Sequence, residues 1–303
     1  MMRAVKWVAA VLVAGLLAAG VVFWERPVEV YQKLAEARML LKGAQSRTAT
    51  VEGIRVHYCV AGRVKGPVVV LVHGLGGRAE DWANLAPYLT HAGFRVYMPD
   101  LPGYGQSAKP ASFSYSVPDE AGAVVGFLDA MGLKRVDLGG WSMGGWVTQL
   151  VAVEHPERVK RLMLFDSAGL YVKPKWDTSV FAPKDEAEVN ELNALLTPNA
   201  PKVPEFVAKD ILRSTRQDGW VIQRAMAAML TGKDTTDAML PKLTMPVLLI
   251  WGQKDEIMPV EQGETIHRLI PQSELDVISG CGHLAPRQCT NRIGPDVVGF
   301  LKQ

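Results

Sequence analysis

Three residues with complementary chemistry each follow an apolar stretch of this chain: a serine at 142, an aspartate at 255 and a histidine at 283. A serine hydroxyl is a weak nucleophile at neutral pH. A neutral imidazole can take its proton, and a carboxylate can fix the imidazole tautomer and stabilise the imidazolium that forms. Since each stretch predicts a β-strand, we expect all three side chains to meet at one edge of a parallel sheet. The set predicts acyl transfer through Ser142.

The serine lies in a glycine-rich segment, Gly139–Gly145, which reads G-G-W-S-M-G-G and contains G-x-S-x-G. A predicted strand precedes it and an apolar helix, 146–153, follows. In such a strand-to-helix turn the serine backbone is pushed to positive φ and its hydroxyl is held above the sheet edge. Gly140 and Gly144 fit because a Cβ at either position would press on the neighbouring strand or the incoming helix. The alternative is an ordinary glycine-rich turn with a solvated serine.

The choice of acid lies between two aspartates at strand ends. Asp255 follows the buried strand predicted over 245–251, and Asp166 follows the strand predicted over 159–165. We favour Asp255 because its strand has the longer buried apolar run and because it lies closer in chain order to His283.

A second glycine-rich loop, His73–Gly77, follows the apolar strand predicted over 68–72. Glycines there would give backbone N–H groups close access to a developing oxyanion. We expect His73 to be structural, holding this loop. Asp100, in the turn-rich segment after the strand predicted over 94–98, is expected to brace its loop rather than to act in catalysis.

Strands and helices alternate along most of the chain from residue 48 onward. Unbroken apolar runs such as 68–72 are typical of parallel strands buried on both faces. The predicted strands cover 50–52, 54–58, 68–72, 94–98, 135–138, 159–165, 245–251 and 274–278, and the predicted helices cover 81–89, 118–131 and 146–153.

The alternation breaks between residues 168 and 240, where helix-like pieces occur at 185–196, 203–216 and 220–230. We interpret this stretch as an inserted helical cap, because substrate pockets form between a sheet edge and such insertions. Its methionines at 226, 229 and 239 could line an adaptable acyl pocket, although ordinary packing explains each one equally well.

The N-terminus predicts a membrane anchor. A basic segment, 1–6, precedes 18 uncharged residues from Trp7 to Trp24, which are long enough to span a bilayer. A cleaved signal peptide is the alternative, but tryptophans at both ends suit interfacial anchoring. An amphipathic neck or linker would cover 25–47 and the catalytic domain 48–303, so a chain that starts near Arg47 is expected to fold and to be active. The charges do not decide which side of the membrane the domain occupies.

Composition excludes some functions. The net charge of +2 in 303 residues creates no strong field for nucleic acid, so we expect no nucleic-acid partner. The three cysteines, Cys59, Cys281 and Cys289, lack metal-ligand spacing, so we expect no metal site and regard them as structural or incidental. Nothing in the sequence predicts a cofactor.

Four motifs together resemble the α/β-hydrolase superfamily: H-G-L-G at 73–76, G-W-S-M-G-G at 140–145, W-G-Q-K-D at 251–255 and G-C-G-H at 280–283. The resemblance covers roughly residue 48 to the C-terminus. With the N-terminal apolar segment, the chain is most similar to membrane-anchored monoacylglycerol lipases and related bacterial lipases.

The resemblance implies an α/β-hydrolase fold with a cap and ester hydrolysis on lipid-like substrates. It implies that Ser142, His283 and Asp255 form the triad and that the backbone N–H groups of Leu75 and Met143 form the oxyanion hole. Carbon–carbon bond hydrolases and cofactor-free perhydrolases share these motifs and remain alternatives, as does a non-catalytic binding protein on the same fold. Dehalogenases and epoxide hydrolases are disfavoured, because they need a carboxylate at position 142.

Overall fold

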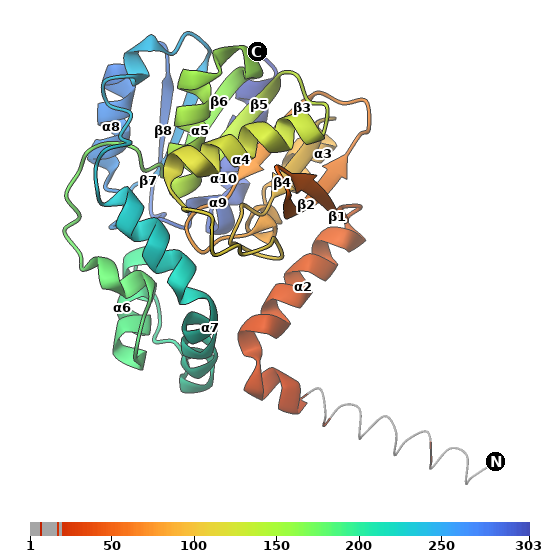
Figure 1. The fold of residues 1–303 in the computed structure, drawn as a ribbon, viewed down its shortest axis with the longest axis vertical. Coiled ribbons are helices and arrows are strands. Elements are labelled where there is room, and N and C mark those ends of the chain that lie inside the picture. Colours follow the sequence, from red (N-terminus) through yellow and green to blue (C-terminus); the bar gives the residue numbers. More distant parts are fainter. Residues whose placement is uncertain (1–6, 8–16, 18–19) are drawn as a thin grey trace.

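The computed structural model describes residues 7, 17 and 20–303, and all structural statements below concern these residues. Its centre is an eight-stranded sheet in the order β1-β2-β4-β3-β5-β6-β7-β8 (Figure 1). The strands are β1 (Gln45–Val51), β2 (Ile54–Gly62), β3 (Val68–Val72), β4 (Arg95–Pro99), β5 (Val136–Trp141), β6 (Val159–Phe165), β7 (Val247–Gly252) and β8 (Glu274–Ile278). The pairs β1–β2 and β2–β4 are antiparallel and every later pair is parallel. The expected mostly parallel α/β-hydrolase sheet is therefore present.

Helices cover both faces of the sheet. On one face α4 (Val117–Ala130), α5 (Met143–Glu154) and α8 (Val260–Leu269) bury apolar side chains against it, and on the other face α3 (Ala86–His91) and α10 (Thr290–Leu301) do the same. The strands β3, β5, β6 and β7 are apolar on both sides because each side meets one of these helical layers. Their carboxyl ends form the edge at which the site is built.

Two helices stand beyond that edge, between β6 and β7 in the sequence: α6 (Glu186–Leu196) and α7 (Glu205–Met229) (Figure 1). They share a small core of Val189, Ala208 and Leu212. The prediction of two helices, 203–216 and 220–230, is wrong, since α7 is continuous through Gly219. One glycine in a helix costs about 1 kcal/mol, and the apolar face of α7, buried on both sides of Gly219, overrides it.

Some boundaries differ from expectation. The helix expected over 81–89 is a 3₁₀ turn, Ala79–Trp82, followed by α3. The first strand begins at Gln45, before the domain start expected at residue 48. Neither α10 nor the short α9 (Ala285–Gln288) was predicted from the sequence.

The helix α2 (Pro27–Leu41) runs where a neck was expected, and it is joined to the cap. The N–H of Val28 donates to Asp210 in α7 (3.0 Å), Arg213 donates to the carbonyl of Glu25 (2.7 Å), and Trp24 stacks on Phe206. A chain starting at Arg47 would lose these contacts and the first two residues of β1. Whether such a chain still folds and is active therefore stays a prediction.

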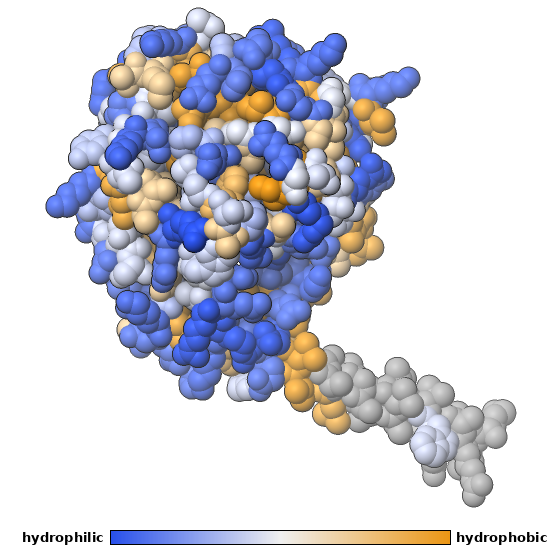
Figure 2. All heavy atoms as spheres, in the orientation of Figure 1, coloured by the Kyte–Doolittle hydropathy of each residue, from blue (hydrophilic) through white to orange (hydrophobic). Residues whose placement is uncertain are grey.

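The apolar stretch at 7–24 lies mostly outside the described residues. Over the part of the chain that is described, no helix combines the length and apolarity needed to cross a bilayer. The last residues of the stretch are described, and Val21, Val22 and Phe23 are half or more exposed. They form the apolar patch beside the grey atoms in Figure 2.

Candidate active site

Ser142 lies in the tight turn between β5 and α5, with φ 57° and ψ −121°. This is the positive-φ geometry expected of the turn. A Cβ on Gly140 would come within 2.1 Å of the carbonyl oxygen of Gly144, and a Cβ on Gly144 within 2.4 Å of the carbonyl oxygen of Val72 on the neighbouring strand. Both glycines are therefore required by close approach, and the serine side chain is left at the sheet edge.

The structure brings the three predicted side chains together. His283 Nδ1 lies 2.7 Å from Asp255 Oδ2, and His283 Nε2 lies 2.9 Å from Ser142 Oγ. With a proton on Nδ1, the imidazole donates to the carboxylate and accepts from the serine hydroxyl. Asp255 is held in turn by the backbone N–H groups of Ile257 and Met258, each 2.8 Å from Oδ1. The arrangement can take a proton from Ser142 and stabilise the resulting imidazolium.

The loop that carries His283 is fixed by residues the sequence analysis did not assign. The indole N–H of Trp141, beside the serine, donates to the carbonyl of His283 (2.9 Å). Cys281 and Cys289 form a disulfide whose two ends lie on either side of His283. The short spacing of the two cysteines around His283 could have indicated the disulfide. The sequence-based expectation that they were structural or incidental did not include this pairing. Cys59 is buried and unpaired.

The two expected oxyanion donors lie on segments that meet at Ser142. Leu75 follows Gly74, and a Cβ added to Gly74 would lie 3.0 Å from Ser142 Cβ. Met143 is the first residue of α5. Neither backbone N–H donates to an acceptor among the described residues. Two free N–H groups near a serine nucleophile can stabilise an oxyanion.

His73 and Asp100 are bound within the loops they were expected to hold. His73 is fully buried, with Nδ1 2.8 Å from the carbonyl of Gly74 and Nε2 accepting from the N–H of Leu101 (3.0 Å). Burial lowers its pKa, so it is neutral. Asp100 accepts from His57 and from the N–H groups of Ala79 and Gln106. Burial alone would raise the pKa of Asp100, but these hydrogen bonds hold it below its usual value.

Asp166, the other candidate acid, lies directly after β6 and is fully buried. Its Oδ1 accepts from the N–H of Gly252 (2.6 Å), and it makes no hydrogen bond to His283. The hydrogen bond to His283 is made by Asp255.

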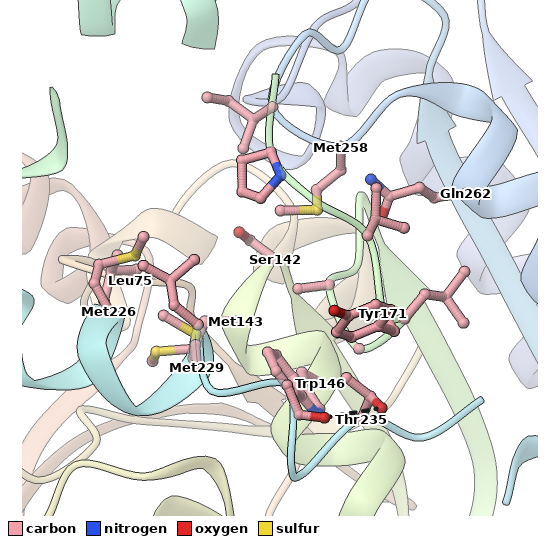
Figure 3. A pocket seen from close by; sticks show the side chains of 18 of the residues that line it. Leu75, Ser142, Met143, Trp146, Tyr171, Met226, Met229, Thr235, Met258 and Gln262 are labelled. Carbon is pink, nitrogen blue, oxygen red and sulfur yellow. Dashed lines mark hydrogen bonds between the residues drawn. The ribbon is translucent and has the colours of Figure 1, made fainter. Parts of the chain in front are cut away.

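A cavity of about 260 Å³ opens beside Ser142, between the sheet edge and the cap. Figure 3 shows Ser142 near its centre, with Met258 on one side and Leu75, Met226 and Met229 on another. Most of its wall is apolar, and the only cationic side chain among the described residues that line it is that of Lys173. Of the three methionines that the sequence offered for an acyl pocket, Met226 and Met229 line the cavity and Met239 does not. The site therefore favours an apolar group next to the serine.

Across residues 20–303 and the two described positions before them, no three His, Cys, Asp or Glu side chains cluster so that they could hold a metal ion.

Comparison with known proteins agrees with this geometry. The family model described as "alpha/beta hydrolase fold" matches residues 67–286. Lipase 3 of Moraxella sp. (strain TA144) is 26% identical over 292 residues, covering 90% of each chain. A 2-hydroxy-6-oxononadienedioate/2-hydroxy-6-oxononatrienedioate hydrolase of Pseudomonas sp. is 29% identical over 267 residues, covering 77% of this chain and 87% of that one. The crystal structure of a membrane phospholipase A superposes with a TM-score of 0.81 at 24% identity, covering 98% of this chain and 99% of that chain, a likeness that shows the fold. The family match spans most of the chain, which therefore belongs to the α/β-hydrolase fold family and is a hydrolase with lipases among its relatives.

Proposed function

We propose that the protein hydrolyses carboxylic esters of lipids, with monoacylglycerols as the favoured substrate class. The observation that carries this proposal is the chain of contacts from Asp255 through His283 to Ser142 Oγ, together with the apolar cavity that Ser142 lines. A serine in this setting attacks an acyl carbonyl, and the cavity suits an acyl chain.

In the proposed mechanism His283 Nε2 takes the proton of Ser142 as Oγ attacks the ester carbonyl carbon. The oxyanion accepts hydrogen bonds from the N–H groups of Leu75 and Met143. The carbonyl re-forms and the alkoxide leaves with the proton from His283, which gives an acyl-enzyme and a free alcohol. Water, deprotonated by His283, then attacks the acyl carbon and releases the fatty acid and Ser142. Asp255 keeps the imidazolium stabilised in both halves of the reaction.

The residues that line the cavity favour a lipid as the substrate, rather than a substrate of the carbon–carbon bond hydrolases. The Pseudomonas relative is named for a dioate, which carries two carboxylates. Binding such a dianion calls for cationic or strong donor groups. Here Lys173 is the single cationic side chain among the described residues that line the cavity, whereas Trp146 and four methionines face it. The lipase relatives agree with an apolar acyl chain.

We also propose that the stretch 7–24 holds the enzyme at a membrane. It is 18 residues long without a charge, and its last residues, Val21 to Phe23, are exposed and apolar. This position would keep the cavity close to poorly soluble substrates. The full-length protein should stay in the membrane fraction after a carbonate wash, and a chain of residues 20–303, which keeps α2 and its contacts with the cap, should not. Release of the full-length protein by the wash would contradict the anchor.

The catalytic proposal is tested with a panel of monoacylglycerols of graded chain length, soluble short-chain esters and a vinylogous 1,5-diketone acid of the type cleaved by carbon–carbon bond hydrolases. Ser142→Ala should abolish ester turnover while the protein stays folded, because the triad acts as a unit. Ester turnover within about tenfold of the parent in Ser142→Ala would contradict the nucleophile. Cleavage of the diketone with no ester turnover would establish the alternative class. Absence of both activities and of labelling by a serine-reactive phosphonate would favour a binding protein.

A further inference from the structure

Asp166 is a buried carboxyl group beside the proposed triad that the mechanism above does not use. Its backbone has φ 43°, in the left-handed region that non-glycine residues rarely occupy. Its N–H donates to the carbonyl of Ile250 (2.9 Å), and its Oδ1 accepts from the N–H of Gly252 (2.6 Å). Asp166 thus joins the end of β6 to the end of β7, and Gly252 begins the turn in which the N–H of Asp255 bonds back to the Gly252 carbonyl (3.1 Å).

The two neighbouring carboxyl groups have very different numbers of donors. Asp255 accepts three hydrogen bonds, from the N–H groups of Ile257 and Met258 and from His283. Asp166 accepts one, and its Oδ2 is buried with no donor among the described residues. Two adjacent buried carboxylates repel, so the pair keeps one proton, and the charge settles where the donors are. This difference in donors favours the proton on Asp166.

The other groups around Asp166 do not offset the repulsion between the two carboxylates. From the β7 side the charge of Asp255 acts on it. From the β5 side the neighbouring group is the backbone of Ser142, and on the segment of Asp166 itself it is the hydroxyl of Ser167; neither titrates in this range. Burial first, and then the charge of Asp255, raise the pKa of Asp166 well above its usual value.

We propose that Asp166 is a neutral carboxylic acid that positions Asp255: Oδ1 fixes Gly252 at the start of the turn, and the protonated Oδ2 faces Asp255 and leaves the negative charge there for His283. Asp166 is thus a positioning residue that touches neither substrate nor reacting atoms. The inference rests on the proposed triad for its functional part, but its protonation can be tested without any activity.

The first test compares the folding equilibrium of the parent with that of Asp166→Asn across pH. A buried acid that stays protonated stabilises the native state most below its unfolded pKa of about 4, and this advantage is lost as pH rises toward its folded pKa. The amide carries no such proton. The ratio of the folding constants, Asp166→Asn over parent, should rise with pH above the unfolded pKa of about 4, by up to about tenfold per pH unit. A flat ratio would overturn the proposal.

The matched control is Asp218→Asn, which makes the same exchange at a half-exposed aspartate of the cap. Its ratio to the parent should not change over the same range. If Asp166→Asn does not fold, carbon-13 NMR of aspartate-labelled parent and Asp255→Asn replaces it. The parent should show a carboxyl that remains protonated at neutral pH, and that signal should titrate at lower pH in Asp255→Asn, where the repelling charge is gone. A parent with no protonated aspartate at neutral pH would overturn the proposal.

The positioning role is read from kinetics on a soluble ester. Asp166→Asn keeps a neutral group with an oxygen for Gly252, so kcat should stay within about threefold of the parent. Asp166→Leu removes the acceptor, and kcat should fall by about tenfold or more with KM unchanged. A loss of kcat in Asp166→Asn equal to that in Asp255→Asn would overturn the role. If no ester is turned over by the parent, the proposed function fails while the pH test of protonation still stands.

Discussion

The carboxyl edge of the sheet and the cap above it are held in different ways. At the edge, Asp255 and His283 are buried and fixed by hydrogen bonds to the backbone of the following turn, to the side chain of Trp141 and to each other. In the cap, α6 and the start of α7 share a small core of their own, and α7 contributes the flexible methionines Met226 and Met229 to the cavity wall. The difference indicates that the reacting groups at the sheet edge are held by backbone geometry, whereas the substrate site is shaped by cap side chains that can be exchanged without moving those groups. Changes at the edge should alter kcat, and changes in the cap should alter which ester is used.

The largest effect is expected from exchanging the two strand-end aspartates. Asp255→Asn should lower kcat by about 10⁴, because the imidazole loses the carboxylate that fixes its tautomer. Asp166→Asn should cost far less. Both variants are assayed on a soluble ester after circular dichroism has shown that they are folded. A greater loss in Asp166→Asn would mean that the wrong aspartate has been assigned to the triad.

In the cap, Met229→Trp should shorten the cavity and lower kcat/KM for long-chain esters by about tenfold, with little change for a butyrate ester. The short ester serves as the internal control, because the reacting groups are unchanged. Equal losses on both substrates would show that this part of the cap does not select the acyl chain, and the comparison above would fail.

The disulfide at the edge allows a stability test. Removing the link with Cys281→Ser and Cys289→Ser together should lower the free energy of unfolding by about 2.5 kcal/mol, the loop-closure value for a link of this length. Since the closed loop contains His283, kcat should fall as well. Denaturant unfolding with and without reductant measures this. The double variant should not respond to reductant, and a parent that is equally unresponsive would contradict the disulfide.

The smallest effect is expected where the cap meets the N-terminal segment. Arg213→Gln removes the contacts with Glu25 and Asp210 and should lower stability by about 0.5 kcal/mol, because this guanidinium is partly exposed. Lys209→Gln, one turn earlier in α7, breaks an exposed pair within the helix and should leave the melting temperature unchanged. A loss several times larger in Arg213→Gln would show that α2 holds the cap more strongly than these contacts indicate.

The sequence predicted the strands of the parallel part of the sheet and the meeting of Ser142, Asp255 and His283, because those features depend on local patterns. Apolar runs mark buried strands, and glycines mark the serine turn. Features that depend on distant neighbours were missed. The attachment of α2 to the cap comes from contacts between segments about 180 residues apart, as in the bond from Val28 to Asp210. The continuity of α7 through Gly219 comes from burial of its apolar face on both sides of the glycine. The pairing of Cys281 with Cys289 needed the path of the loop, which spacing alone does not give.

The central claim is that Ser142, activated by His283, is the residue that takes the acyl group. The most direct test is labelling by a fluorophosphonate, followed by mass spectrometry of the modified peptide. The account predicts one adduct, on Ser142, in the parent, none in Ser142→Ala, and strongly slowed labelling in a folded His283→Ala. An adduct on another residue, or labelling of Ser142→Ala at the parent's rate, would contradict it.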